Sequence, residues 1–332
     1  MKLKKTSVPE NITCPVCQNE CKNSVLSTYT IEETASYFCP PTRNKDRYER
    51  LLSIIFKLWK RQQSYLVECD VCTFKFGYPH VGGDEAFYGI LHEQYGYPTW
   101  RVDYDIAIEK VIKNFDSGKI LDIGAGSGNF LKSLSKNWNL QALEGSDTTR
   151  KILAEKNINA ASSFQELLSD GQNTFDLITM FQVLEHISDF YMTLENCHKL
   201  LKKGGKIFIS VPDGVDMVLQ EEILLSPDYP PNHINKWTVP SIKFALEKTG
   251  FSEIHFLKTP NSLNELKSAI HVKMLSDASK KNKSLAGLIY RIQSKKIRIP
   301  FLLFLSIITI IKLLPNIYKL YRGRTLIVYA NA

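Results

Sequence analysis

The sequence predicts an α/β fold built on a doubly wound, mostly parallel sheet, and two observations support this prediction. From Lys119 onward, short apolar segments alternate with segments of helical periodicity, as in a sheet with helices on both faces. The first apolar segment ends in the glycine-rich turn GAGSG at 124–128, which leads into a helix and lets the backbone approach a bound ligand. The 332 residues suffice for this domain and for attached segments.

We expect a strand at each apolar segment and a helix between successive strands. The expected strands are 119–123, 140–144, 158–161, 175–181, 205–211, 251–258 and 324–330. The expected helices are 47–63, 128–136, 147–156, 189–201 and one that Thr238 caps and Gly250 ends. Residues 11–80 are otherwise expected to be rich in loops, and a long polar loop is expected after Val211.

Two acids flank the glycine turn, and this pattern distinguishes between cofactors. Dinucleotide-binding folds carry G-x-G-x-x-G, but Asn129 occupies the position of its third glycine. Asp122 precedes the turn and would repel a pyrophosphate, whereas it suits a ligand with an ammonium and a sulfonium group. Glu144 ends the next strand and can accept hydrogen bonds from both hydroxyls of a ribose. The alternative is that both acids only cap the ends of their strands.

Four segments together resemble class I S-adenosylmethionine-dependent methyltransferases: ILDIGAGSGNF, ALEGSD, FDLITMFQVLEHISD and LKKGGKIFISVPD. The resemblance covers about residues 119–251. It implies a Rossmann-like, seven-stranded, mostly parallel sheet with an antiparallel last strand at 324–330, and S-adenosylmethionine as the cofactor.

The same resemblance implies the residues around the cofactor. These are Asp122 and Gly124 at the methionine end, Gly126 and Gly128 in the turn, Glu144 at the ribose, Phe164 against the adenine, and Phe181 and Gln182 along the cleft. The sequence departs from the family at two places. Gln182 stands where many relatives have an acidic or small polar residue, and the segment INAASSFQEL lacks the acid that is common near the adenine.

Four of the seven cysteines form two C-x-x-C pairs, Cys14 with Cys17 and Cys69 with Cys72. Two such pairs can complete a tetrahedral site of four thiolates around one zinc ion. The 51 residues between the pairs exceed the usual zinc-ribbon separation, so independent free thiols remain an alternative. Cys21 or Cys39 could replace a member of the set, and Cys197 is expected to be a buried, small apolar residue.

The stretches YLVECDVCTFKF, VGGDEAFYGIL and YPTWRVDY resemble the N-terminal half of bacterial methyltransferases that carry a zinc-binding domain ahead of the catalytic one. Some of those enzymes act on sugars or other secondary metabolites. A closed site of four thiolates leaves no open coordination position, so the zinc would be structural. Because this half is not notably basic, we do not expect a nucleic-acid partner. The aromatic run Tyr95–Tyr104 either shapes the substrate cleft or packs between domains.

Two histidines are candidates for a general base that removes a proton from the methyl acceptor. His186 follows the fourth strand, near the edge where open α/β sheets bind ligands. His233 lies in the loop after the fifth strand, in SPDYPPNHINKWT. Each has a structural alternative, because His186 could hold its loop in place and His233 could belong to the start of the following helix.

The basic charge of the protein is concentrated at its end. The net charge is +8, and residues 278–332 contain 11 Lys and Arg but no Asp or Glu. Within them, the 14 residues between Pro300 and Pro315 are mostly apolar and include one charged residue, Lys312, and this stretch is too short to span a bilayer. Residues 278–322 therefore fit an anionic membrane surface, or alternatively a helix packed against protein.

These observations predict four segments and one main function. The segments are an N-terminal zinc-ribbon-like domain at 1–83, a methyltransferase domain at 84–259, a helical insertion at 260–322 and the last strand at 323–332. The expected function is methyl transfer to a small molecule or glycan, such as a sugar, a sugar nucleotide or a lipid-linked saccharide. The alternatives are an RNA or protein acceptor, or a binding protein without activity. Because no apolar region follows the basic start, we expect a cytoplasmic protein, peripheral at the inner membrane face if the insertion binds lipid.

Overall fold

The computed structural model describes the chain in five stretches: residues 12–22, 25–93, 99–226, 228–280 and 284–332. The described residues form two compact units. One unit contains residues up to 214, 229–257 and 325–332, and the other contains 215–228 and 258–324. Tyr95 and Tyr97 of the predicted aromatic run lie outside the described residues, as do Lys281 and Lys283 of the basic segment.

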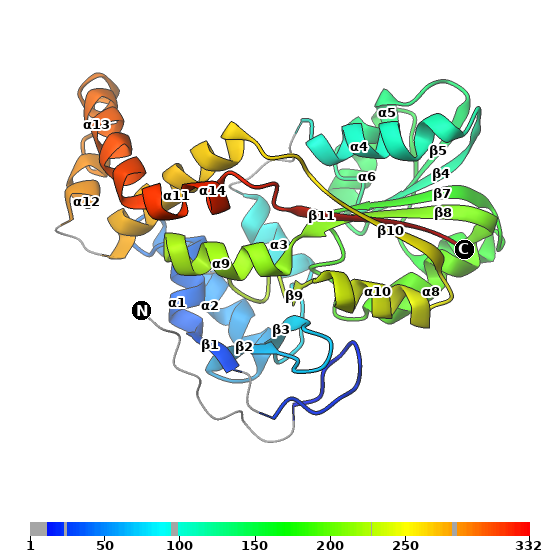
Figure 1. The fold of residues 1–332 in the computed structure, drawn as a ribbon, viewed down its shortest axis with the longest axis horizontal. Helices are drawn as coiled ribbons and strands as arrows, with labels where there is room; N and C mark the ends of the chain where they lie inside the picture. Colours follow the sequence, from blue (N-terminus) through cyan, green and yellow to red (C-terminus); the bar gives the residue numbers. More distant parts are fainter. Residues whose placement is uncertain (1–11, 23–24, 94–98, 227, 281–283) are drawn as a thin grey trace. The chain divides into compact units, whose positions relative to one another are not determined.

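Within the described residues of the first unit, seven strands form the main sheet in the order β10-β11-β8-β7-β4-β5-β6 (Figure 1). The strands are β4 (Gly118–Ile123), β5 (Trp138–Leu143), β6 (Asn159–Ala161), β7 (Phe175–Phe181), β8 (Leu201–Pro212), β10 (Ser252–Lys258) and β11 (Thr325–Asn331). The pairs β4–β5, β4–β7, β5–β6 and β7–β8 are parallel, and β11 is antiparallel to β8. The predicted mostly parallel, seven-stranded sheet is confirmed.

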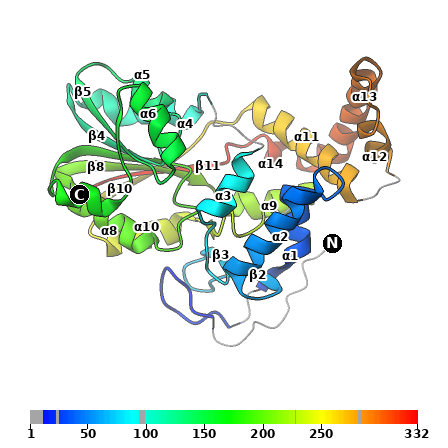
Figure 2. The same cartoon turned by 180° about the vertical axis from the view of Figure 1, so that it is seen from behind.

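Helices cover both faces of this sheet because its strands are apolar on both faces. In β4, Ile120 packs into one core, whereas Leu121 and Ile123 pack into the other. Figures 1 and 2 show α4 (Val102–Lys110), α5 (Asn129–Ser133) and α6 (Asp147–Glu155) on one face. The opposite face carries α8 (Phe190–Leu200) and α10 (Val239–Lys248), with α7 (Phe164–Ser169) in contact with α8. A 3-10 turn, η1 (Ile112–Asn114), follows α4.

The N-terminal part of the chain contains a second, antiparallel sheet that the sequence did not predict. Among the described residues its order is β1-β2-β3-β9, with β1 (Val25–Thr30), β2 (Gln63–Glu68), β3 (Lys75–Tyr78) and β9 (Asn235–Lys236). The expectation of a loop-rich segment was therefore wrong for these strands. The strand β9 comes from far along the chain, so the N-terminal sheet is completed by the segment that follows His233.

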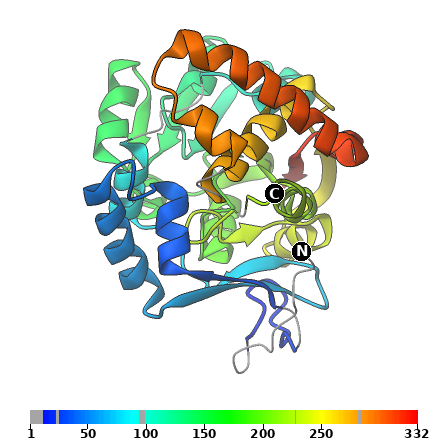
Figure 3. The ribbon, with the colours of Figure 1, turned by 90° about the vertical axis from the view of Figure 1, so that its left-hand side faces the viewer.

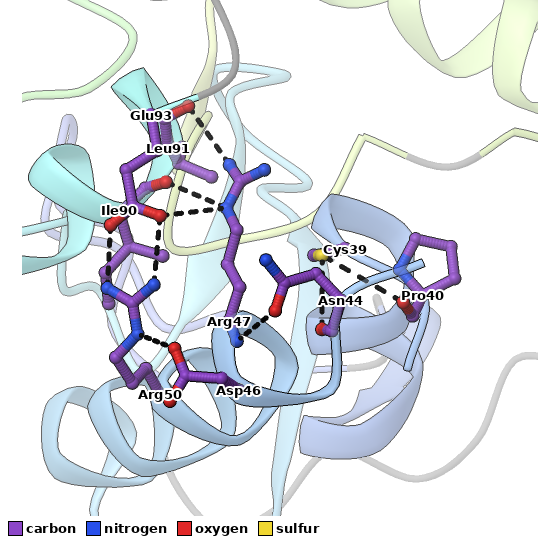
Figure 4. Close-up of polar contacts among 9 residues, drawn as sticks. All are labelled: Cys39, Pro40, Asn44, Asp46, Arg47, Arg50, Ile90, Leu91 and Glu93. Atoms are coloured by element: carbon purple, nitrogen blue, oxygen red, sulfur yellow. Dashed lines mark hydrogen bonds and ion pairs between the residues drawn. The ribbon is translucent and has the colours of Figure 1, made fainter. Parts of the chain in front are cut away.

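Three helices accompany this sheet: α1 (Ile31–Phe38), α2 (Lys45–Trp59) and α3 (Glu85–His92). Figure 4 shows how α2 holds the end of α3. The buried Arg47 side chain donates hydrogen bonds to the carbonyls of Ile90 and Leu91, at 3.0 and 3.1 Å. Arg50 pairs with Glu93 at 2.7 Å. Cations at the carboxyl end of a helix satisfy its last carbonyls and favour its dipole, so α2 fixes where α3 ends.

The second unit consists of helices. They are α9 (Gly214–Leu224), α11 (Leu263–Lys280), α12 (Leu285–Tyr290), α13 (Lys295–Leu313), the 3-10 turn η2 (Leu314–Asn316) and α14 (Ile317–Leu320). Figure 3 shows its chain turning from yellow-orange α11 to orange-red α13. Leu224 of α9, Ala269 of α11 and Leu313 of α13 share one small core. The expectation of a polar loop after Val211 was wrong for residues 214–224, which form α9.

The helix α13 begins before the apolar stretch that lies between Pro300 and Pro315. It starts at Lys295 and continues through Pro300, which lies in its second turn and removes a single N–H from the ladder. Together with the turns after it, the helical segment Lys295–Leu320 has 26 residues, and its most apolar window of 18 residues has a mean hydropathy of 2.2 and is 17% buried. Among the described residues, this segment has the length and composition to cross a membrane.

Candidate functional site

The glycine turn after β4 adopts a backbone that glycine residues favour. Gly124, Gly126 and Gly128 all have positive φ, at +69°, +52° and +72°. A Cβ on Gly124 would lie 2.6 Å from Val183, and a Cβ on Gly128 would lie 2.6 Å from Leu153. Both the conformation and the close packing therefore restrict these positions. The turn leaves backbone exposed at the carboxyl end of β4, where open α/β sheets bind ligands.

Asp122 lies at this edge of the sheet with 3% of its surface exposed. Thr179 of the neighbouring β7 donates a hydrogen bond of 2.7 Å to its carboxylate. Burial and the negative charges of Glu144 and Asp103 raise the pKa of Asp122, the hydrogen bond from Thr179 lowers it, and the net pKa is about 7. A buried carboxyl in such surroundings is stabilised as an anion by a nearby cation. The site therefore favours a positively charged ligand.

Glu144 lies directly after β5 and reaches back to the glycine turn. Its carboxylate accepts hydrogen bonds from the N–H groups of Gly126 and Ser146, at 3.2 and 3.3 Å. The structure thus brings together Asp122, the glycine turn and Glu144, which the sequence predicted to share one ligand. The half-buried Glu144 keeps acceptor capacity for a further donor such as a ribose hydroxyl.

The three other predicted cofactor residues have different surroundings. Phe164 is half-buried at the start of α7, directly after the capping residue Ser163. Phe181 is buried, with its ring 4.5 Å from that of Phe130. Gln182 has a φ of +57°, and within the described part of the chain its buried Nε2 atom has no hydrogen-bond partner. A buried donor of this kind fits a site that a ligand completes.

The four predicted cysteines converge in the N-terminal part. The Sγ atoms of Cys14, Cys17, Cys69 and Cys72 all lie within 4.8 Å of one another, with Cys14–Cys72 at 3.6 Å and Cys17–Cys69 at 3.4 Å. Four thiolates at about 2.3 Å from one zinc ion are separated by about 3.8 Å, so the spacing fits a tetrahedral site. The hydrogen bond that Cys72 shares with Cys14 lowers the pKa of Cys72. Cys197 is fully buried in α8, as predicted.

The two C-x-x-C turns have the same local geometry. In each, the residue after the second cysteine has a positive φ, at +62° for Gln18 and +59° for Thr73. In each, that residue donates its N–H to the carbonyl of the first cysteine, at 3.0 Å. The N–H of Val71 also points to the Cys69 sulfur at 3.4 Å. These turns aim both sulfur atoms of a pair at one point, which explains how pairs 51 residues apart form one cluster.

The two predicted histidines lie side by side. The ring centroids of His186 and His233 are 4.7 Å apart, and both side chains are half-buried. One nitrogen of His186, Nδ1, lies 2.9 Å from the carbonyl oxygen of Asn232 and 3.0 Å from the hydroxyl of Tyr88. A proton on Nδ1 is donated to this carbonyl, which leaves Nε2 as the acceptor.

Backbone contacts hold the His233 loop against both the N-terminal sheet and the turn after β7. Gly77 donates its N–H to the carbonyl of Ile234 at 2.8 Å. Ile234 and Asn235 both donate their N–H groups to the carbonyl of Glu185 at 3.0 Å. The Asn235 side chain donates to the carbonyls of Leu184 and Ile187, at 2.9 and 2.7 Å. The zinc-ribbon-like part therefore contributes directly to the position of His233.

Sequence reasoning missed Tyr88 and Asn235 and gave little weight to Glu185. Tyr88 lies on α3, nearly a hundred residues before the histidine that it contacts. Glu185 is fully buried, and its side-chain oxygen lies 3.9 Å from Nε2 of His186. The polar segment NHIN around His233 was the available signal for Asn235, but nothing in its spacing indicated pairing with β3.

Comparison with known proteins agrees with this geometry. Residues 103–255 match the model of a family described as a methyltransferase domain. This part of the chain is therefore similar to methyltransferase domains. A stretch of 100 residues is 33% identical to a ubiquinone biosynthesis O-methyltransferase of Coxiella burnetii, covering 27% of this chain and 42% of that protein. A stretch of 148 residues is 28% identical to a trans-aconitate 2-methyltransferase of Enterobacter sp., covering 42% and 58%. The methyltransferase relatives are thus matched over about half of their length.

Two solved structures of methyltransferases are similar to part of this chain. A SAM-dependent methyltransferase from Archaeoglobus fulgidus is 17% identical with a TM-score of 0.45, covering 74% of this chain and all of that one. A phosphoethanolamine N-methyltransferase from Haemonchus contortus, in complex with S-adenosyl-L-methionine, is 15% identical with a TM-score of 0.42, covering 69% and 52%.

Proposed function

We propose that this protein transfers a methyl group from S-adenosylmethionine to a small-molecule or glycan acceptor. The observation that carries the proposal is that Asp122, the glycine turn and Glu144 lie close together at the carboxyl ends of β4 and β5. The methyltransferase family match over residues 103–255 supports it, as do relatives named for O-methyl transfer to small molecules.

The residues at this edge fit the cofactor. The raised pKa of Asp122 calls for a cation, which the methionine amino group provides, and Glu144 has room for the ribose hydroxyls. The buried Nε2 of Gln182 can donate to the cofactor, and the glycine turn allows close approach without a Cβ in the way. When bound, S-adenosylmethionine supplies a methyl group on a sulfonium that leaves readily. The chain then needs only to align the acceptor and assist the loss of its proton.

We assign the activation of the acceptor to His186 and His233. Both follow the sheet edge that binds the cofactor, and their rings lie together. A hydroxyl acceptor placed at these rings has a neutral nitrogen within reach, because Asn232 orients Nδ1 of His186 toward the backbone. The acceptor classes that fit are a sugar, a sugar nucleotide or a lipid-linked saccharide.

We further propose that Cys14, Cys17, Cys69 and Cys72 hold one structural zinc ion. The support is the convergence of their sulfur atoms and the matched geometry of the two turns. With all four positions taken by sulfur, the ion has no place for an acceptor, and its part is to fix the fold.

The insertion also suggests where the protein works. We propose that α13 lies on an anionic membrane surface, which would make the protein peripheral at the cytoplasmic face and bring it to a lipid-linked acceptor. The support is the exposed apolar stripe of α13 between clusters of Lys and Arg, on a segment without acids.

The direct test of methyl transfer combines binding with turnover. The purified full chain should bind S-adenosylmethionine in calorimetry, and its melting temperature should rise with the ligand. Incubation with a pool of sugars, sugar nucleotides and lipid-linked saccharides should release S-adenosylhomocysteine. No binding would refute the proposal. Binding without turnover on this pool, but with turnover on RNA or protein, would replace the acceptor class.

A further inference from the structure

The turn after β7 carries a set of side chains whose grouping goes beyond a pair of candidate bases. One oxygen of Glu185 and one nitrogen each of His186 and His233 lie within 4.8 Å of one another. Within the described residues, the only other His, Cys, Asp and Glu group with such spacing is the cysteine cluster. Two imidazoles with one carboxylate are the ligands of many catalytic zinc and other transition-metal sites.

The side chains are already oriented as metal ligands are. Metal-bound histidines usually donate their second nitrogen to a backbone carbonyl or carboxylate. Here Nδ1 of His186 faces the carbonyl of Asn232 at 2.9 Å, so that Nε2 points to the group, 3.9 Å from the Glu185 carboxylate. Ligand atoms around one such ion are separated by about 3.3 Å, which small side-chain rotations reach from the observed spacing.

The backbone around the three ligands is fixed by other contacts. The Glu185 carbonyl accepts two N–H groups from the segment after His233, which locks the two ligand-bearing loops together. Gly82 approaches so closely that a Cβ there would lie 2.3 Å from the carbonyl of His186. Such support is what a preorganised site requires.

Charge also favours a cation at this point. The Glu185 side chain is fully buried, and a buried carboxylate is costly unless positive charge lies close to it. The guanidinium of Arg101, which forms an ion pair with Asp103 at 2.9 Å, acts on this carboxylate electrostatically, and a bound cation would add to that stabilisation. Both histidine side chains are half-buried.

We propose that Glu185, His186 and His233 bind a divalent transition-metal cation, which activates a hydroxyl group of the methyl acceptor. This proposal rests on the proposed methyl transfer and names how His186 and His233 serve it. The cation draws electron density from the hydroxyl oxygen, whose proton leaves to water. The oxygen then takes the methyl carbon, the carbon–sulfur bond breaks, and its electron pair stays on sulfur.

The test measures metal binding separately from activity. The full chain is treated with EDTA under conditions that leave the cysteine-bound zinc in place, and elemental analysis verifies one zinc per chain. Mn²⁺ is then titrated, with free Mn²⁺ followed by electron paramagnetic resonance, and Zn²⁺ is titrated in parallel by calorimetry. We expect one further ion per chain. Failure of both metals to bind beyond the cysteine zinc would overturn the proposal.

Variants then locate the ion. His233→Ala and the isosteric Glu185→Gln should weaken binding by more than about tenfold, as the loss of a ligand does. His255→Ala is the matched control, because His255 is exposed and stacks on Tyr329 in the same unit. Unchanged melting temperatures would show that the site variants remain folded. If His233→Ala and Glu185→Gln both bound the ion as the control does, the assignment would be wrong.

The same samples separate this proposal from the proposed function. Calorimetry with S-adenosylmethionine should give the same affinity before and after EDTA, because Asp122 and Glu144 do not belong to the metal group. If the metal-free protein kept full methyl transfer, the cation would have no role and the histidines would act as bases. If the protein did not bind S-adenosylmethionine even before EDTA treatment, the proposed methyl transfer itself would be refuted.

Discussion

At the residue scale, the buried carboxyl of Asp122 makes the stability of the protein depend on pH. Its pKa is raised from the ordinary value to about 7 by burial and by the charges of Glu144 and Asp103. The folded state therefore holds this proton more tightly than the unfolded state. The contribution to stability is complete below about pH 4, and it is lost as the pH rises through about 7.

Replacing this carboxyl by an amide separates its two effects. Asp122→Asn should increase the free energy of unfolding at pH 8 by up to about 4 kcal/mol, because an amide has no charge to desolvate. The same change should weaken S-adenosylmethionine binding, since the amide cannot pair with the amino group. Denaturant unfolding at pH 5 and pH 8 and calorimetry measure the two effects. Equal stabilisation at both pH values would contradict the ionisation argument.

A second residue-scale prediction concerns the ribose. Glu144→Ala should weaken S-adenosylmethionine binding by about 1–3 kcal/mol, the scale of hydrogen bonds to a charged group. Glu155→Ala is the control, because it removes an exposed carboxylate on α6, away from the glycine turn. If calorimetry gave both variants the affinity of the wild type, Glu144 would not hold the ribose.

At the element scale, the zinc-ribbon-like turns and the acceptor loop are parts of one structure. The turn with Cys69 and Cys72 connects β2 to β3, and β3 pairs with β9 directly after His233. The hydroxyl of Tyr191 on α8 donates to the carbonyl of Val16 at 2.6 Å, which ties the other turn to α8. A zinc ion held by the four cysteines, as proposed, would therefore support the position of His233 through β3 and β9.

This connection predicts an unequal effect of zinc loss. Cys72→Ser should abolish zinc binding and reduce methyl transfer strongly, because β3 and β9 lose their support. Its affinity for S-adenosylmethionine should change much less, since Asp122, the glycine turn and Glu144 lie at the ends of β4 and β5. The matched control is Cys39→Ser, a buried cysteine outside the cluster. Elemental analysis, calorimetry and turnover measure the three quantities, and zinc-free Cys72→Ser with full turnover would contradict the connection.

Predictability from sequence differs between elements for physical reasons. The main sheet was predicted closely because its strands are short, apolar and separated by strong turn signals, as with FDLITMF at β7. The sheet β1-β2-β3-β9 was missed because β9 has only two residues and pairs across about 160 positions. Local patterns contain no information on such contacts. The same holds for Tyr88, whose role at His186 comes from tertiary packing alone.

In the second unit, a helix lies where a loop was expected from the sequence. The segment GVDMVLQEEIL was assigned to a loop because polar residues surround it, although most of its residues favour helix. Pro300 lies inside α13, because a proline in the second turn costs one hydrogen bond and leaves the rest of the helix intact. Context, not the proline itself, decides where such a helix begins.

At the scale of the whole molecule, charge and apolar surface are both concentrated in one helical unit. The buried stripe of α13, Leu305, Thr309 and Leu313, faces its own unit. The opposite stripe, which includes Leu303, Ile307 and Ile311, is more than half exposed. The neighbouring α11 is rich in charged and polar residues, so it cannot follow α13 into hydrocarbon. This arrangement favours a helix lying on a membrane over one crossing it.

Binding to liposomes tests this arrangement. We expect the full chain to bind vesicles that contain anionic phosphatidylserine, to bind neutral phosphatidylcholine vesicles weakly, and to lose most binding as salt rises. Each cation near the surface adds about 1 kcal/mol, and 0.1 M salt screens charges over about 10 Å. The triple change of Lys295, Lys296 and Arg298 to Gln should reduce flotation with anionic vesicles. The same change at the exposed Lys113, Lys132 and Lys136 should not.

The apolar stripe should add a component that salt does not remove. Leu303→Ser and Ile307→Ser should lower the residual binding at high salt, while methyl transfer to a soluble acceptor stays intact, because both side chains face away from the core of their unit. If the stripe instead covers a second copy of the chain, the two variants would dissociate a dimer in light scattering. Under that arrangement, the vesicles would show no preference for anionic lipid. The remaining possibility is that α13 crosses the membrane. Carbonate washing tests it, because the wash releases a peripheral protein from the membrane but retains one with a spanning helix.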